Sequence, residues 1–373
     1  MNRMKGMLQR FSNGRSFLKH GMFAAGAATA GTALMGQGLS AFGRRPGDDR
    51  SERSDDGLDN LTRGDVAILR LLAAAEIIET DLWQQYSELG GIDAASSGYT
   101  AGLLQLDGDM PQYISDNTDD EISHVQFLNA YLQSKGEEPV NLDRFRTLPG
   151  SQATGAQQIG RLTNLMQLAV DTSWWTRYRS TKNPDLVARF AQAVPTLSVG
   201  QHPAIPRNND ELGDANNVSD HVQAIANTAG FHFGFIEQAG TSLYATMSQR
   251  VSSPEVLKIT LSIGGSEIMH FQTWHDKAGN AVALTDGDLV FPDLKNSHDE
   301  TLQANLIMPE PCQFISKKLP PCAIIRPTGP GQIDASGAIN GFIADGLFIG
   351  QTREFLQLVL GLAAEADEPR RER

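Results

Sequence analysis

Apolar residues recur at helical spacing along four long stretches of this chain. In residues 62–89 they follow a 3.6-residue period, at Ile68, Leu71, Leu72, Ala75, Ile78 and Leu82. The other three stretches are residues 111–135, 219–249 and 254–277. Because each apolar stripe must be buried against another helix, the pattern predicts an all-α protein built on a four-helix bundle.

Capping residues support the predicted helix ends. Thr62 or Asp65 can cap the first helix, and Ser253 can cap the fourth, where Pro254 occupies the first turn. Gly136 follows the second helix, at a position that often adopts a left-handed backbone. The bundle is therefore expected to span residues 61–282.

A long crossover separates the second and third helices. This insertion, residues 137–218, is expected to contain a helix at 156–178, a shorter helix at 184–193 and a loop at 201–217. Residues 283–373 form a C-terminal extension in which prolines cluster and periodicity is lost. Within it, one further helix is expected at 339–364.

Two Glu-x-x-His pairs lie on the predicted helices, and each follows a helix with a lone glutamate among apolar residues. The set is Glu76, then Glu121 with His124, then Glu237, then Glu267 with His270. Residues three apart share one helix face, so each pair can reach one cavity. A four-helix bundle that holds two metal ions needs this set of residues.

The spacing predicts how the six side chains would divide between two ions. Glu76, Glu121 and His124 would hold one ion, and the other would be held by Glu237, Glu267 and His270. Glu121 and Glu267 are the expected bridges. Four carboxylates and two imidazoles suit two iron or two manganese ions. The alternative is that these are surface glutamates and core histidines, but burying four carboxylates without a cation would be costly.

Several neighbouring residues are weaker candidates. Glu79 lies one turn after Glu76 and could replace or assist it. Aromatic residues stand two turns after three of the glutamates, at Trp83, Tyr244 and Trp274. The tryptophans are expected in the core. Tyr244 is a candidate catalytic residue, which could hydrogen-bond a ligand carboxylate or carry a radical, or could simply be core.

Other histidines and tryptophans are not expected in the site. His232 and His275 lie five residues from Glu237 and His270, so they point elsewhere on their helices. His221 has no assigned role beyond the start of the third helix. Trp174 and Trp175 are expected to pack the insertion onto the bundle, with a substrate lid as the alternative.

The N-terminus has the pattern of an export signal. Residues 1–43 hold basic side chains up to Lys19, then an Ala/Gly-rich stretch that is too rich in glycine for a stable membrane span. Residues 12–19 are similar to a twin-arginine signal, with Gly14 where the first arginine should stand. We expect an exported, periplasmic or extracellular protein; a disordered basic tail is the alternative. The polar residues 44–60 read as a disordered linker.

Net charge limits the classes of binding partner that are expected, and cysteine content limits the types of metal site. The formal net charge of -13 excludes nucleic acid as an expected partner. Cys312 and Cys322 are too few for a four-cysteine metal site. In an exported protein they would form one disulfide; in the cytosol they would be two thiols.

Residues 235–240 (FIEQAG) with Leu243 and Tyr244, and residues 264–270 (GGSEIMH), resemble the second half of the ferritin-like domain family, in its desiccation-associated branch. Residues 75–79 (AEIIE) and 120–124 (DEISH) resemble the first two helices of that branch. The resemblance implies a ferritin-like fold and a di-iron or di-manganese site; the activity of that branch is largely undefined. Manganese catalases have a similar ligand order. A storage shell is not expected, because of the long insertion and extension.

The expected function is redox chemistry on a small oxidant, peroxide or dioxygen, or on ferrous iron, in stress protection. The alternative is a non-catalytic structural or binding module in which the metal site stabilises the fold or is vestigial. A third hypothesis is that the insertion and extension form a binding surface for another envelope protein. An exposed aromatic patch around Trp174 and Trp175 in the structure would favour it. A homo-oligomer is left open.

Overall fold

The structure is a computed structural model that describes residues 61–180, 185, 190–296, 307, 309–310, 315–316, 318–325 and 333–369. The predicted export signal and linker, residues 1–60, lie outside the described residues. So does Cys312, while Cys322 is exposed, and the disulfide therefore stays a prediction. Among the described helices, none has the length and apolar character needed to cross a bilayer.

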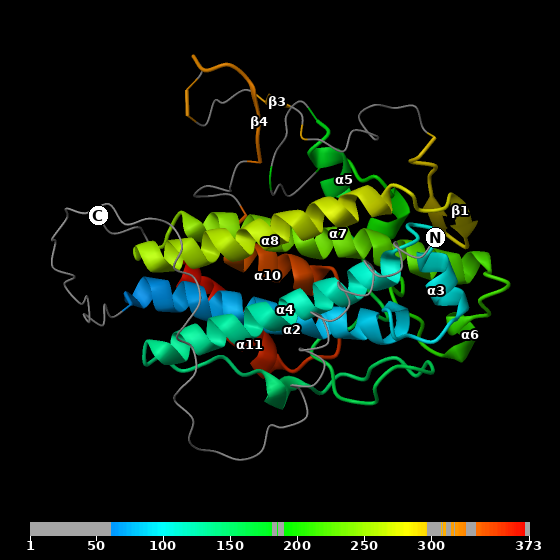
Figure 1. The fold of residues 1–373 in the computed structure, drawn as a ribbon, viewed down its shortest axis with the longest axis horizontal. Coiled ribbons are helices and arrows are strands. Elements are labelled where there is room, and N and C mark those ends of the chain that lie inside the picture. Colours follow the sequence, from blue (N-terminus) through cyan, green and yellow to red (C-terminus); the bar gives the residue numbers. More distant parts are fainter. Residues whose placement is uncertain are drawn as a thin grey trace, which may run out of the picture. The chain divides into compact units, whose positions relative to one another are not determined.

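Four long helices form the bundle as predicted. α2 (Arg63–Gly90) packs along α4 (Met110–Ser134), and α7 (Asp220–Ser248) packs along α8 (Pro254–Ala278) (Figure 1). Every predicted end is within one residue of the observed end. The side chain of Thr62 accepts a hydrogen bond from the backbone N–H of Asp65, and Ser253 caps α8 in the same way.

Aromatic rings fill the middle of the bundle. The ring of Trp83 on α2 stacks on Phe233 of α7 and on Trp274 of α8, with centroids 4.9 and 5.2 Å apart. Trp83 and Trp274 are therefore core residues, as expected. At Gly264 of α8 a Cβ atom would lie 2.9 Å from the Cβ of Tyr244, so the absence of a side chain lets α7 and α8 approach closely.

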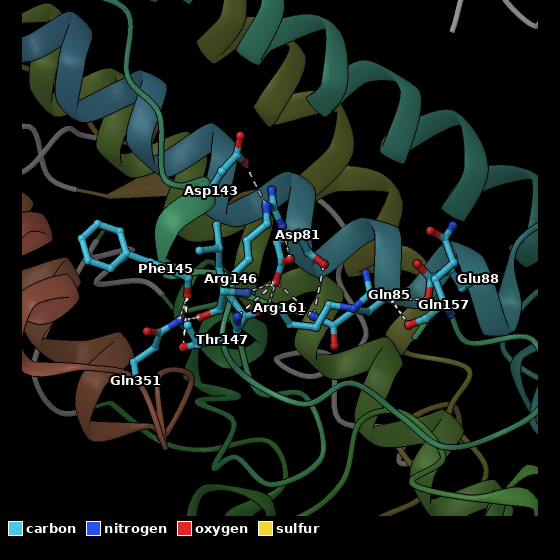
Figure 2. Close-up of polar contacts among 12 residues, drawn as sticks. Asp81, Gln85, Glu88, Asp143, Phe145, Arg146, Thr147, Gln157, Arg161 and Gln351 are labelled. Carbon is cyan, nitrogen blue, oxygen red and sulfur yellow. Dashed lines mark hydrogen bonds and ion pairs between the residues drawn. The ribbon is translucent and has the colours of Figure 1, made fainter. Parts of the chain in front are cut away.

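The predicted helix at 156–178 is wrong except for α5 (Ser173–Arg177). The fully buried carboxylate of Asp81 on α2 accepts hydrogen bonds from the backbone N–H groups of Leu162 and Thr163, each 3.0 Å long. It also pairs with the guanidinium of Arg146 at 2.6 Å (Figure 2). These contacts hold the segment against α2 and take up backbone donors that a helix would need, so tertiary contacts outweigh local helix propensity.

Other parts of the crossover also depart from the prediction. Residues 190–193 are not helical, and most of the predicted helix at 184–193 lies outside the described residues. Four short helices were not predicted: α3 (Gly98–Leu103), η2 (Asp143–Phe145), η3 (Pro195–Ser198) and α6 (Asn209–Leu212), the last inside the expected loop.

Trp174 and Trp175 are 0% and 2% exposed. The Trp174 indole fills the space left by Gly234 on α7, so these tryptophans pack the insertion onto the bundle. This is the packing that the sequence predicts for them. The exposed aromatic patch that would favour a binding surface for another envelope protein is not found at these two residues.

The C-terminal extension begins with a hairpin and ends with two helices. β1 (Leu284–Asp286) pairs antiparallel with β2 (Leu289–Phe291), and β3 (Pro309–Glu310) pairs with β4 (Cys322–Ala323). The single helix predicted at 339–364 is wrong, because the chain forms α10 (Ala335–Ala344) and α11 (Arg353–Asp367). Gly346 and Gly350 separate them with φ angles of 90° and 92°, which break a helix.

Both terminal helices lie against the bundle. α11 contacts α2, and α10 contacts α7 and α11 (Figure 1). The extension therefore adds a helical layer to the side of the bundle where α2 and α7 run.

Candidate metal centre

The six predicted side chains come together in the core of the bundle. Their donor atoms form two groups, in each of which all atoms lie within 4.8 Å of one another. We call the first group position A; it consists of Glu76, Glu121, His124 and Glu267. Position B consists of Glu121, Glu237, Glu267 and His270. Glu121 and Glu267 belong to both, which is where the sequence expects the bridges.

Each long helix contributes to this cluster through the spacing of its residues. His124 Nδ1 lies 2.9 Å from Glu121 Oε2 on the same helix, and 3.4 Å from both Glu76 Oε2 and Glu267 Oε1. His270 Nδ1 lies 3.1 Å from Glu121 Oε1 and 3.3 Å from Glu237 Oε2. Both imidazoles thus turn Nδ1 toward the carboxylates.

The buried oxygens fit a metal pair. Glu76, Glu121, Glu237 and Glu267 are each no more than 1% exposed. Both oxygens of Glu267, and Oε2 of Glu76 and of Glu237, have no hydrogen-bond partner among the residues that the structure describes. Buried carboxylate oxygens without a partner are costly, and metal ligation would satisfy them. Oxygen and imidazole donors in this number suit iron or manganese; their ligation stays a prediction.

Burial and mutual contacts shift the pKa values of the carboxyl and imidazole groups in the cluster. Burial raises the pKa of Glu121 to about 7 and raises that of Glu267 well above its usual value. Burial alone would lower the pKa of His124, but the neighbouring carboxylates of Glu121 and Glu76 outweigh it and raise the pKa to about 10. A cation that binds here must displace these protons.

Position B has an amide and a carboxylate behind it. Asn117 Nδ2 donates to Glu121 Oε1 and to Glu237 Oε1, both at 2.9 Å, and Trp274 Nε1 donates to Asn117 Oδ1 at 2.7 Å. His270 Nε2 lies 3.0 Å from Asp120 Oδ2. These roles of Asn117 and Asp120 were not predicted from the sequence. The available signal was that Asn117 lies one turn before Glu121.

Position A has a phenol behind it. The hydroxyl of Tyr244 donates a hydrogen bond to Glu76 Oε1. The ring is buried, and burial together with the charge of Glu76 raises the pKa of Tyr244 well above its usual value. This contact is the hydrogen bond to a ligand carboxylate that the sequence offered as one role for Tyr244.

A fifth carboxyl group lies beside the cluster. Glu79 is 9% exposed and enters neither position, although burial and the charges of Glu121 and Glu237 raise its pKa well above the usual value. Its counterpart in the other half, three residues after Glu237, is Gly240. A Cβ atom there would overlap the carboxylate of Glu267, so glycine leaves room for that ligand.

His232, His275 and His221 lie outside both positions, as expected. His232 Nδ1 contacts the hydroxyl of Tyr86 at 2.6 Å, and burial lowers its pKa to about 3. His275 contacts Arg179, and its pKa is lowered by burial and by that guanidinium. His221, in the first turn of α7, has Nδ1 2.7 Å from Asp286 Oδ2.

Comparison with known proteins gives one family. A family model described as a ferritin-like domain matches residues 64–279, which is more than half of the chain. No curated protein and no solved structure matches. The matched region runs from the start of α2 to the end of α8 and contains all six side chains of the cluster. By its sequence, its helical bundle and this buried cluster, the chain belongs to the ferritin-like domain family.

Proposed function

We propose that the protein carries a di-iron or di-manganese centre and performs redox chemistry on peroxide, dioxygen or ferrous iron in stress protection. The observation that carries the proposal is the pair of overlapping groups, positions A and B, which share Glu121 and Glu267. Two redox-active ions held there would supply one electron each and an open coordination position for an oxygen ligand.

The residues around the ions have separable roles in this proposal. Asn117 fixes one oxygen each of Glu121 and Glu237, so their remaining oxygens face the centre. The Tyr244 hydroxyl does the same for Glu76 from the other side. Glu79 lies one turn after Glu76, and burial together with the neighbouring carboxylates raises its pKa, so it is a candidate proton donor to an oxygen ligand at the centre.

The setting of this chemistry is proposed from the sequence. Export to the periplasm or outside the cell is supported by the basic and Ala/Gly-rich residues 1–43. Membership of the desiccation-associated branch is supported by residues 75–79 and 264–270. Self-association stays open. The negative net charge of -13 supports a small-molecule oxidant rather than nucleic acid as the partner.

Elemental analysis combined with peroxide and oxygen consumption on one sample tests the proposal. About two iron or manganese ions per chain, with turnover, is the result expected for a di-metal centre. Metal without turnover would replace the proposal with the structural module, in which the ions raise thermal stability only. Failure to take up metal after reconstitution would contradict the proposal altogether.

A further inference from the structure

A cavity of about 60 Å³ lies between α2, α7 and α10, beside position A. Its inner wall includes Glu76, Glu79 and Tyr244. Of the six cluster residues only Glu76 lines it, so the cavity reaches position A and not position B. The two metal positions therefore differ in what can approach them.

Carbon makes up most of the cavity wall. Leu71 and Ile78 come from α2, Ile236 and Leu243 from α7, and Ile339 and Phe342 from α10. One water needs about 10–15 Å³ on this measure of volume, so the cavity is larger than peroxide or dioxygen requires. A space with apolar walls and polar groups at its inner end suits an apolar molecule with one polar end.

A polar chamber of about 400 Å³ adjoins this cavity. Asp171, Arg177 and Gln192 line the chamber, and it shares Phe235, Ala338, Phe342 and Asp345 with the apolar cavity. The rings of Phe235 and Phe342 meet edge to face with centroids 6.1 Å apart. This aromatic pair therefore lies in the wall that the apolar cavity and the polar chamber share.

The third wall of the cavity is supplied from outside the ferritin-like region. The family match ends at residue 279, whereas α10 spans Ala335–Ala344. Residues 64–279 provide the cluster and the walls from α2 and α7, and the C-terminal extension closes the remaining side. The cavity is thus a feature of this chain and does not follow from the bundle alone.

We infer that this cavity binds a small organic molecule with an alkyl or aryl body and one terminal hydroxyl or hydroperoxyl group. The body lies among the side chains of α2, α7 and α10, and the terminal oxygen lies beside Glu76 and Tyr244. The assignment of this molecule as a substrate rests on the proposed function, because its terminal oxygen would lie beside the metal ion at position A. The binding itself can be tested without metal.

Calorimetric titration of the full chain with straight-chain alcohols, from butanol to octanol, tests the binding. Burial of a methylene group is worth about 0.8 kcal/mol, so affinity should rise about fourfold per added carbon until the cavity is full and then level off. Affinity that does not depend on chain length would overturn the inference.

Matched variants locate the binding. Ala338 of α10 lines the cavity, and Ala338→Leu should abolish the rise with chain length. Ala344→Leu makes the same change at an exposed position of the same helix and should leave it intact. Equal binding by both variants would contradict the inference. If Ala338→Leu does not fold, as judged by circular dichroism, Phe342→Ala decides, because it should move the plateau to longer alcohols.

The metal-free and metal-loaded chains separate this inference from the proposed function. If the chain binds alcohols but takes up no metal, the inference about the cavity stands and the proposed metal centre is rejected. Metal uptake and peroxide turnover without alcohol binding would reject the cavity alone.

Discussion

The two halves of the centre use the same ligand types but surround them differently. The α2/α4 half supplies Glu76, Glu121 and His124, and the α7/α8 half supplies Glu237, Glu267 and His270. Beside Glu76 lie a phenol, a carboxyl group whose pKa is raised by burial, and an apolar cavity. Behind Glu237 and His270 lie the amide of Asn117 and the carboxylate of Asp120, both from α4.

This difference indicates that the two metal positions have different functions. A carboxylate that accepts from a histidine ligand fixes the ring and raises its basicity, which strengthens metal binding. Asp120 does this for His270, while the residue before Glu267, the counterpart of Asp120, is Ser266. We therefore expect position B to hold its ion more tightly and position A to be the one where ligands exchange.

Removal of a shared ligand should have the largest effect. Glu267→Ala takes an oxygen donor from both positions, so both ions should be lost, whereas Glu76→Ala should lose only the ion at A and His270→Ala only the ion at B. Elemental analysis of the purified variants measures this. Glu354→Ala, at an exposed site on α11, is the control and should keep full metal content. Full occupancy in Glu267→Ala would refute the shared-ligand arrangement.

The stability of the metal-free protein should fall as the pH rises from about 4.5 to about 7. Burial raises the pKa of Glu121 to about 7, so the folded state binds more protons than the unfolded state in this window. The stability contributed is fully present below the unfolded pKa and is lost as pH passes the folded pKa, by about 3 kcal/mol for this group.

Thermal melts of the metal-free and metal-loaded chains at pH 5 and pH 8 check this pH dependence. Metal should remove most of it, because the ions replace the protons. Glu79→Gln sharpens the comparison of the two halves, since the extra acid with a raised pKa belongs only to the α2/α4 half. That variant should lose less stability at pH 8 than the unchanged protein. An equal loss would show that Glu79 is ionised in the folded state.

Replacing Asp120 should weaken one position and spare the other. Asp120→Asn removes the carboxylate from His270 Nε2, and changes of this kind cost roughly 10- to 100-fold in metal affinity. Stepwise titration with a spectroscopically visible divalent ion should resolve two binding steps. In Asp120→Asn the affinity of the tighter step should fall toward that of the weaker step. Ser266→Asp is the converse change and should strengthen position A. Identical steps in all three proteins would mean that the halves are equivalent.

Local sequence patterns were sufficient for the bundle and for the grouping of the six side chains. The 3.6-residue period predicted the helices α2, α4, α7 and α8. The spacing of three residues predicted that Glu121 and His124 share one helix face and meet in the metal cluster. Contacts across the fold could not be predicted in this way. Asn117 meets Glu237 from 120 residues away.

The wrong predictions have two different causes. Asp81 holds residues 162 and 163 out of a helix through contacts more than 80 residues apart in sequence. The predicted helix at 339–364 overlooked a local signal, because Gly346 and Gly350 adopt positive φ angles and end the helix. Apolar periodicity identifies a buried face, but it does not say whether one helix or two will present it.

Tyr244→Phe should have the smallest effect on binding and a selective effect on chemistry. It removes one hydroxyl that donates to Glu76, and a hydrogen bond to a charged group contributes about 1.5–3 kcal/mol net. In the loaded protein the ion at position A takes over part of that role, so metal content should be unchanged by elemental analysis. Peroxide consumption should fall, because Glu76 then has no hydrogen bond from the side of the cavity.

Asn117→Ala is the matched change in the other half, and it should weaken metal binding at position B. Both variants could instead alter metal content equally and leave peroxide consumption per bound ion unchanged. The phenol and the amide would then have equivalent roles, and the difference between the two halves would not affect the reaction.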